Sequence, residues 1–178
     1  MPRGILIPAD RTAPLEQGTF NRLEDYQAAV GGPIEAVDLP EIGVTIYANE
    51  IGVIQQLPVN SRATLLWWFG RPSRRRKAVL VGDLVMVGLP TRAGDSTDIP
   101  ADLAQSIMNP HGHRVELTMR GASARYVSET VACNYFEAIV LAQTLLDHWA
   151  EATVAEIVPR SELEAFEDAP YRNGQKPW

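Results

Sequence analysis

Hydrophobic and polar residues alternate in several short stretches of the chain, and a period of two predicts β-strands. The clearest alternation runs over residues 114–120, where every second side chain is apolar. Residues 44–48 alternate in the same way and are rich in β-branched side chains. Shorter apolar runs predict further strands at 5–7, 34–39, 53–57, 78–87 and 154–158. The run at 78–87 fits either two strands around a turn or one strand with a bulge at its glycine.

Apolar residues at intervals of three and four predict helices elsewhere. The best case is 134–151, whose wide apolar face is expected to cover the sheet. Shorter patterns predict helices at 20–30 and 62–69 and a brief one near 100–107. The helix at 20–30 is expected to end at Gly31, because glycine adopts the left-handed conformation that closes many helices.

These elements predict an α+β fold, because strands and helices do not alternate regularly along the chain. We expect a mainly antiparallel sheet of five to seven short strands, covered by a long C-terminal helix and two or three shorter helices. A chain of 178 residues corresponds to one domain, which we place at residues 1–158. Residues 159–178 are predicted to form a flexible tail.

The composition is that of an ordinary globular protein, with 46% hydrophobic and 21% charged residues. The formal net charge of −6 favours solubility and provides no general attraction for nucleic acid. No apolar run approaches the roughly 20 residues needed to cross a bilayer, and no signal peptide is visible. The chain has a single cysteine, Cys133, so an intrachain disulfide is excluded. We expect Cys133 to be a buried residue that packs like a small apolar side chain. We therefore expect a cytoplasmic protein that does not associate with membranes.

Three polar residues of the first half form the candidate binding group: Asn49, Asn60 and Arg62. Asn60 or Ser61 can cap the helix at 62–69, and the start of a helix favours anions, so Arg62 beside it is a possible anion or partner site. The alternative is structural. In that case the asparagines shape turns and caps, and the arginine pairs with an acidic residue on the surface.

A basic stretch follows the helix at 62–69 and is the candidate nucleic-acid contact. Its cations follow directly after an aromatic run that includes Trp68, and cations beside aromatic rings suit a nucleic-acid backbone with stacked bases. The cations are Arg71, Arg74, Arg75, Arg76 and Lys77. The alternative is a solvated loop that balances acidic residues or contacts a partner subunit.

No motif for catalysis or for a cofactor is apparent in the sequence. His111 and His113 flank a glycine after a proline, which indicates a turn with two exposed histidines rather than a metal site. No glycine-rich phosphate loop and no nucleophile elbow is present. We therefore expect no metal, no cofactor and no catalytic residue, although dispersed catalytic groups would leave no motif.

One longer pattern carries a family resemblance. The segments LEDYQAA, VGG-x-IE, NE-x-G and LP-x-N-x-RA, followed by VGD and VMVG, lie within residues 23–107. This pattern resembles the uncharacterised family catalogued as domain of unknown function 3846. Residues 113–158 would then be a C-terminal extension of the family core. The resemblance implies an accessory protein of phages, plasmids or integrated elements, often found with antirestriction and conjugation functions, and it implies no known activity or cofactor.

Three hypotheses for function follow. The first is a non-catalytic binding or adaptor protein of a phage or mobile element, which contacts a host or element-encoded protein through an exposed apolar or aromatic patch, for example around Tyr47 or Trp68. The second is a nucleic-acid-associated protein that uses residues 71–77. The third is a small enzyme or ligand-binding protein in which Asn49, Asn60, Arg62 and Asp83 converge. A homo-oligomer is compatible with all three.

Overall fold

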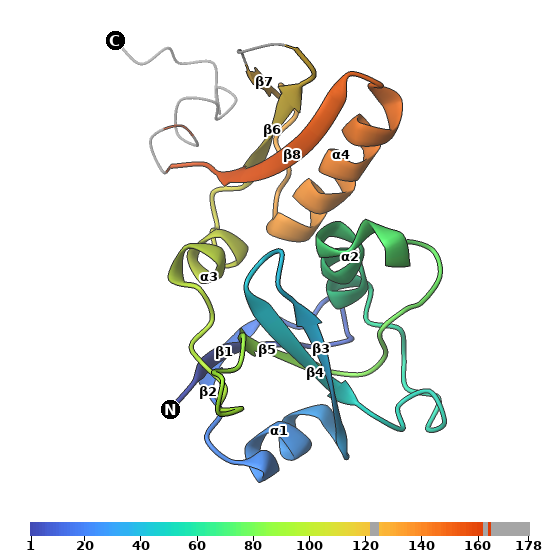
Figure 1. Cartoon of the computed structure of the whole chain (residues 1–178), viewed down its shortest axis with the longest axis vertical. Helices are drawn as coiled ribbons and strands as arrows, with labels where there is room; N and C mark the ends of the chain where they lie inside the picture. Colours follow the sequence, from blue (N-terminus) through green and yellow to red (C-terminus); the bar gives the residue numbers. More distant parts are fainter. Residues whose placement is uncertain (122–124, 162–163, 165–178) are drawn as a thin grey trace, which may run out of the picture. The chain divides into compact units, whose positions relative to one another are not determined.

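The computed structural model of the protein describes residues 1–121, 125–161 and 164. Within it the chain divides into two compact units, one from Met1 to Gln105 and one that begins at Ser106. The division falls inside the short helix α3, Ala101–Ile107 (Figure 1). The two units are described separately below.

The first unit is built on a five-stranded antiparallel sheet with the strand order β2-β1-β5-β4-β3. Its strands are β1 (Arg3–Ile7), β2 (Glu16–Thr19), β3 (Ile34–Leu39), β4 (Val44–Asn49) and β5 (Leu84–Gly88). All five residues of the central strand β5 are buried, because both faces of the sheet are covered. The predicted hairpin of β3 and β4 is confirmed, with Leu39 opposite Val44 at its turn.

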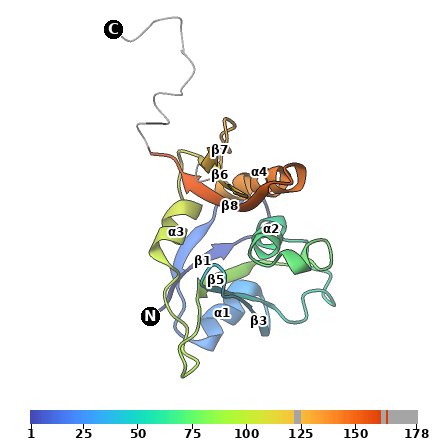
Figure 2. The ribbon, with the colours of Figure 1, turned by 45° about the horizontal axis from the view of Figure 1, so that its top comes forward.

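One helix covers each face of this sheet (Figure 2). Helix α1 (Leu23–Val30) buries Tyr26 and Val30 against Val85 and Val87 of β5. It ends at Gly31, whose φ of 74° is the left-handed cap expected from the sequence. Helix α2 (Ser61–Gly70) lies over the opposite face and buries, among others, Ala63 and Leu66.

The second unit holds a three-stranded antiparallel sheet in the order β7-β6-β8. Its strands are β6 (His113–Met119), β7 (Arg125–Val127) and β8 (Ala152–Pro159), and helix α4 (Tyr135–His148) packs on β6 and β8. The buried face of β6 is the one predicted by alternation, since Val115 and Leu117 are fully buried. Across the sheet, Val115 lies opposite Ile157.

The α+β class with antiparallel strands is confirmed, but two details of the predicted architecture are wrong. The strands form two sheets with eight strands in total among the described residues, not one sheet of five to seven. The long C-terminal helix is also wrong. Helix α4 has 14 residues and is followed by β8, because Trp149 adopts an extended backbone that ends the helix.

Three local predictions also need correction. Residues 53–57 are turns rather than a strand, and β2 and β7 were not predicted because each is short and carries few apolar residues. The extended segment before Gly82 forms only an isolated bridge between Val59 and Val81.

The predicted single domain over residues 1–158 stays a prediction, and the predicted tail lies almost wholly outside the described residues. No helix in the described part of the chain is long and apolar enough to cross a membrane.

Candidate functional site

Asn49, at the end of β4, is 4% exposed and uses its side chain to hold two neighbouring segments together. Its Nδ2 contacts the carbonyl oxygens of Val30 at 3.3 Å and Gly31 at 3.1 Å, which lie at the end of α1. The same nitrogen lies 3.1 Å from Oε1 of Gln55, and Oδ1 accepts a hydrogen bond from Ile51 N at 3.0 Å. Asn49 therefore joins α1 to the turn-rich segment that follows β4.

That segment, residues 50–57, is called the 50–57 loop below. Its backbone is closed on itself, because Gln55 N donates to Ile51 O at 2.9 Å and Leu57 N donates to Gly52 O at 3.0 Å. Gly52 has no room for a side chain, since a Cβ there would lie 2.9 Å from Cγ2 of Val81. The base of the loop is thus fixed by close packing.

Asn60 caps α2 and is completely buried. Its Oδ1 accepts a hydrogen bond from Ala63 N at 3.1 Å, which satisfies one of the free N–H groups at the helix start. Its Nδ2 donates to Ile7 O at 2.8 Å and to Gly82 O at 3.0 Å. The cap predicted from the sequence is confirmed, and the same side chain also joins the ends of two other segments.

Arg62 binds backbone carbonyl oxygens rather than the acidic residues considered from the sequence. One terminal nitrogen donates to Ala13 O at 2.9 Å, and the other donates to Pro8 O at 2.7 Å and Asp10 O at 2.8 Å. Burial lowers the pKa of the Arg62 guanidinium, and the charge of Asp10 opposes that shift. Arg62 therefore anchors the segment after β1 to the first turn of α2.

The structure brings Asn60, Arg62 and Asp83 to the same place, the end of β1. Asp83 accepts a hydrogen bond from Ala9 N at 2.8 Å, next to the carbonyl groups that Asn60 and Arg62 bind. Asn49 acts separately, at the end of α1. The side-chain groups of these residues are engaged with the backbone of the chain itself, so their assignment as a binding site stays a prediction.

The basic stretch forms the turn after α2, including the short 3-10 helix η1 (Pro72–Arg74). Arg74, Arg76 and Lys77 are exposed, whereas Arg71 and Arg75 are half-buried. Arg71 approaches Glu41, with 3.9 Å between Nε and Oε1. The indole of Trp68 is half-buried and its Nε1 donates to Ala78 O at 2.8 Å. Trp68 therefore does not provide a fully exposed ring next to the exposed cations.

Exposed apolar side chains occur at residues other than Tyr47 and Trp68, around which an exposed patch was expected from the sequence. Val53 is 74% exposed and Ile54 is 81% exposed at the tip of the 50–57 loop. Val59 and Val79 are also exposed. The bridge between Val59 and Val81, and the close approach of Gly52 to Val81, place the segments that carry these residues next to one another. We call Val53, Ile54, Val59 and Val79 the apolar surface. In the sequence, the aliphatic pair Val53-Ile54 lies between Gly52 and two glutamines. This arrangement indicates a loop with exposed side chains rather than a strand.

Other residues considered from the sequence also differ from expectation. Cys133 is exposed rather than buried. His113 is fully buried on β6 rather than exposed, with 2.6 Å between its Nε2 and Ser106 O. Tyr47 is half-buried with its ring 4.6 Å from that of Tyr26, so it is not part of an exposed patch. In the described part of the chain, no group of three or more histidine, cysteine or acidic side chains is arranged to hold a metal.

Comparison with protein families gives a match to Domain of unknown function (DUF3846) over residues 2–112. The chain belongs to the DUF3846 family. The DUF3846 match begins before the span of 23–107 expected from the sequence pattern, so β1 and β2 are part of it. Neither the curated proteins nor the solved structures gave a match. Within the DUF3846 pattern, Asn49, Gly52 and Asn60 have the structural roles described above.

Proposed function

We propose that this DUF3846 protein is a non-catalytic binding protein that contacts another protein through the apolar surface. The observation that supports this proposal is the exposure of Val53 and Ile54, at 74% and 81%, on a loop whose base is closely packed. Adjacent aliphatic side chains in water are a source of binding free energy. Burying each of them fully contributes about 1.5–3 kcal/mol.

The rigidity of the 50–57 loop favours binding by this surface. A loop that is ordered before association loses less conformational entropy when a partner binds. Asn49 and the packing of Gly52 provide that order without using the exposed tip. Asn49 and Gly52, which belong to the family pattern, thus hold the loop that carries the exposed Val53 and Ile54.

We propose further that the partner belongs to the host or to the element that carries the gene. The resemblance to accessory proteins of phages and mobile elements supports a role in host interaction or in countering host defence, in the cytoplasm. The proposal that the protein is not an enzyme is supported by the site itself. The polar groups of Asn60, Arg62 and Asp83 converge, but they bind backbone groups of their own chain.

Nucleic-acid binding is the second candidate function, favoured by the exposure of Arg74, Arg76 and Lys77. Phosphate contacts of this kind need only exposed cations and make binding strongly dependent on salt. The half-buried Trp68 offers little support for base stacking. We therefore rank this function below protein binding.

The test is capture of partners from host-cell extract on the immobilised protein, with identification by mass spectrometry and nuclease-treated extract in parallel. Three variants are compared with the wild type: Val53→Ser with Ile54→Ser, then Arg74, Arg76 and Lys77 each to Ser, and Val140→Ser as a control. Val140 is matched because it is a similarly aliphatic residue, 46% exposed, that lies on α4 outside the apolar surface.

We expect a protein that is retained by the control and by the basic-stretch variant but not by the Val53/Ile54 variant. With the purified partner, the double variant should weaken binding at least about tenfold, which corresponds to 1.4 kcal/mol. Capture that is unchanged by the Val53/Ile54 variant would contradict the proposal. Loss of capture only in the basic-stretch variant, together with nuclease sensitivity, would support the nucleic-acid function instead.

A further inference from the structure

The described strands leave four sheet edges, and three of them have features that prevent pairing with another strand. Strand β2 has four residues and strand β7 has three, which is too short for extended pairing. Strand β3 carries exposed Glu35 and Asp38 and lies between Pro33 and Pro40. Short length, charge and proline are the usual protections of an edge.

Strand β8 is the fourth edge and lacks these protections over most of its length. It has eight residues and is last in the order β7-β6-β8. Proline occurs only at its final residue, Pro159. In the part of the chain that the structure describes, no strand lies beyond it.

The register of β6 and β8 shows which backbone groups point outward. Arg160 N donates to Gly112 O, so Val154, Glu156 and Val158 face β6 with their backbone hydrogen-bonding groups. The N–H and C=O groups of Ala155 and Ile157 therefore point away from the sheet. These are the groups that a further antiparallel strand would bind.

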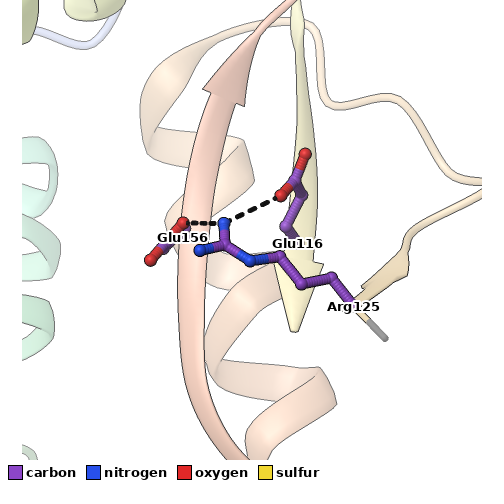
Figure 3. A network of polar contacts seen from close by, with 3 residues as sticks. All are labelled: Glu116, Arg125 and Glu156. Atoms are coloured by element: carbon purple, nitrogen blue, oxygen red, sulfur yellow. Dashed lines mark hydrogen bonds and ion pairs between the residues drawn. The ribbon is translucent and has the colours of Figure 1, made fainter. Parts of the chain in front are cut away.

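The side chains of β8, on both faces of the sheet, do not oppose pairing of this edge with a further strand. Val154 is 49% exposed, and Ala155, Ile157 and Val158 are half-buried. The single charged residue of the strand is Glu156, and that charge is already paired. Arg125 reaches across from β7 and lies 2.5 Å from Glu156 and 3.1 Å from Glu116 (Figure 3).

We propose that β8 pairs with β8 of a second copy of this chain, antiparallel and about a two-fold axis, and joins the two small sheets into one of six strands. A second copy is the occupant because it brings an equally open edge, so one contact covers both edges and closes the assembly. Arg125 offsets part of the negative charge of Glu116 and Glu156, which reduces repulsion between two copies of the same edge. The favoured register places Ala155 on the axis, because a register centred on Glu156 would set like charges opposite each other.

The experiment measures the mass of the full chain in solution by light scattering over a range of concentrations up to roughly 200 μM, since small interfaces are weak. The test variant is Ala155→Pro, which removes only an outward N–H group and leaves the bonds between β6 and β8 in place. The control is Ala36→Pro. Ala36 is an exposed residue of the β3 edge, and its N–H also points outward because Glu50 N bonds to Pro33 O.

We expect the wild type and Ala36→Pro to reach twice the 19.6 kDa of one chain and Ala155→Pro to remain at the mass of one. A second variant, Val154→Glu, places a carboxylate directly opposite Glu156 of the other copy in the register centred on Ala155, without changing the backbone, and should also remain a single chain. If Ala155→Pro fails to fold, the mass of this second variant in solution tests the proposal. A wild type that stays a single chain at the highest concentration, or a dimer that survives Val154→Glu or a folded Ala155→Pro, would overturn the proposal.

Discussion

Asn60 and Asn134 begin helices in the same way but differ in what else their side chains do. Asn134 is exposed, its Oδ1 accepts hydrogen bonds from Phe136 N and Glu137 N, and its Nδ2 reaches only the side chain of Glu137. Asn60 is fully buried, and its Nδ2 binds two backbone carbonyl oxygens that have been removed from water. The same residue type thus has a local role in α4 and a long-range role in α2.

We predict that Asn60→Ser destabilises the protein by about 2–4 kcal/mol, because Ile7 O and Gly82 O lose a buried donor that serine cannot replace. Asn134→Ser should change stability by no more than about 0.5 kcal/mol, since serine caps helices as well as asparagine does. Urea unfolding followed by circular dichroism measures both values. Equal effects at the two positions would show that capping alone accounts for Asn60.

His113 gives a pH dependence to stability. Burial lowers its pKa from the usual 6.5, and the contact with Ser106 O opposes that shift only in part. Above about pH 6.5 the ring is neutral in both the folded and the unfolded chain, so it contributes no slope. As the pH falls below that value, the unfolded chain binds the proton first, and the folded state loses stability until the lowered pKa is reached.

The prediction is that the urea midpoint falls between about pH 7 and about pH 5, and that His113→Gln reduces this fall. Glutamine keeps an N–H group for Ser106 O but does not titrate in this range. Urea titrations of both proteins at several pH values provide the measurement. A pH slope that is the same in the variant and the wild type would assign the effect to other groups.

At the scale of elements, the 50–57 loop depends on the backbone of Gly82. Gly82 has a φ of 74°, and a Cβ there would lie 2.8 Å from Cδ1 of Leu57. Gly94 also has a positive φ, of 90°, but nothing lies within 4 Å of its Cβ position. Substitutions at the two glycines therefore distinguish the cost of a left-handed backbone from the cost of a steric clash with Leu57.

Gly94→Ala should cost about 1 kcal/mol, from the left-handed backbone alone. Gly82→Ala should cost about 1–3 kcal/mol more, because the added methyl group displaces Leu57. Thermal and urea unfolding give the difference between the two variants. If both substitutions cost the same, Leu57 moves aside freely, and the base of the loop is less fixed than the contacts indicate.

The elements also show how far the sequence predicted the fold. Periodicity identified β6, α1 and α4, because in each of them one face is more buried than the other. Strand β4 is buried on both faces and was identified with the help of its β-branched side chains. Periodicity failed for β2, whose EQGT sequence has no apolar face, and for residues 53–57, where aliphatic side chains are exposed on a loop. Asn60 was recognised as a cap from its position before a helix, but its bonds to Ile7 and Gly82 depend on tertiary contacts that spacing does not encode.

At the scale of the whole molecule, the DUF3846 match and the first compact unit cover nearly the same residues. The match spans 2–112 and the unit ends at Gln105. The five-stranded sheet, α1 and α2 all lie within that span, together with the apolar cluster around Tyr26 and Val85. This part of the chain therefore contains its own core.

We predict that a fragment of residues 1–112 folds alone and unfolds cooperatively in urea. Its amide spectrum should overlay that of the full chain for most residues of β1 to β5. Cooperative unfolding is expected because the fragment keeps every strand of its sheet and both covering helices. A fragment with a collapsed, poorly dispersed spectrum would show that residues 113–178 are needed for folding, in agreement with one domain over 1–158.

The closely packed base of the 50–57 loop has a consequence for change over time. Because Asn49, Gly52 and Leu57 determine the path of the backbone, positions 53 and 54 are free to accept other side chains without cost to the fold. Under the proposed binding function, substitutions at these two positions would change the partner that the surface recognises while leaving the fold unaltered.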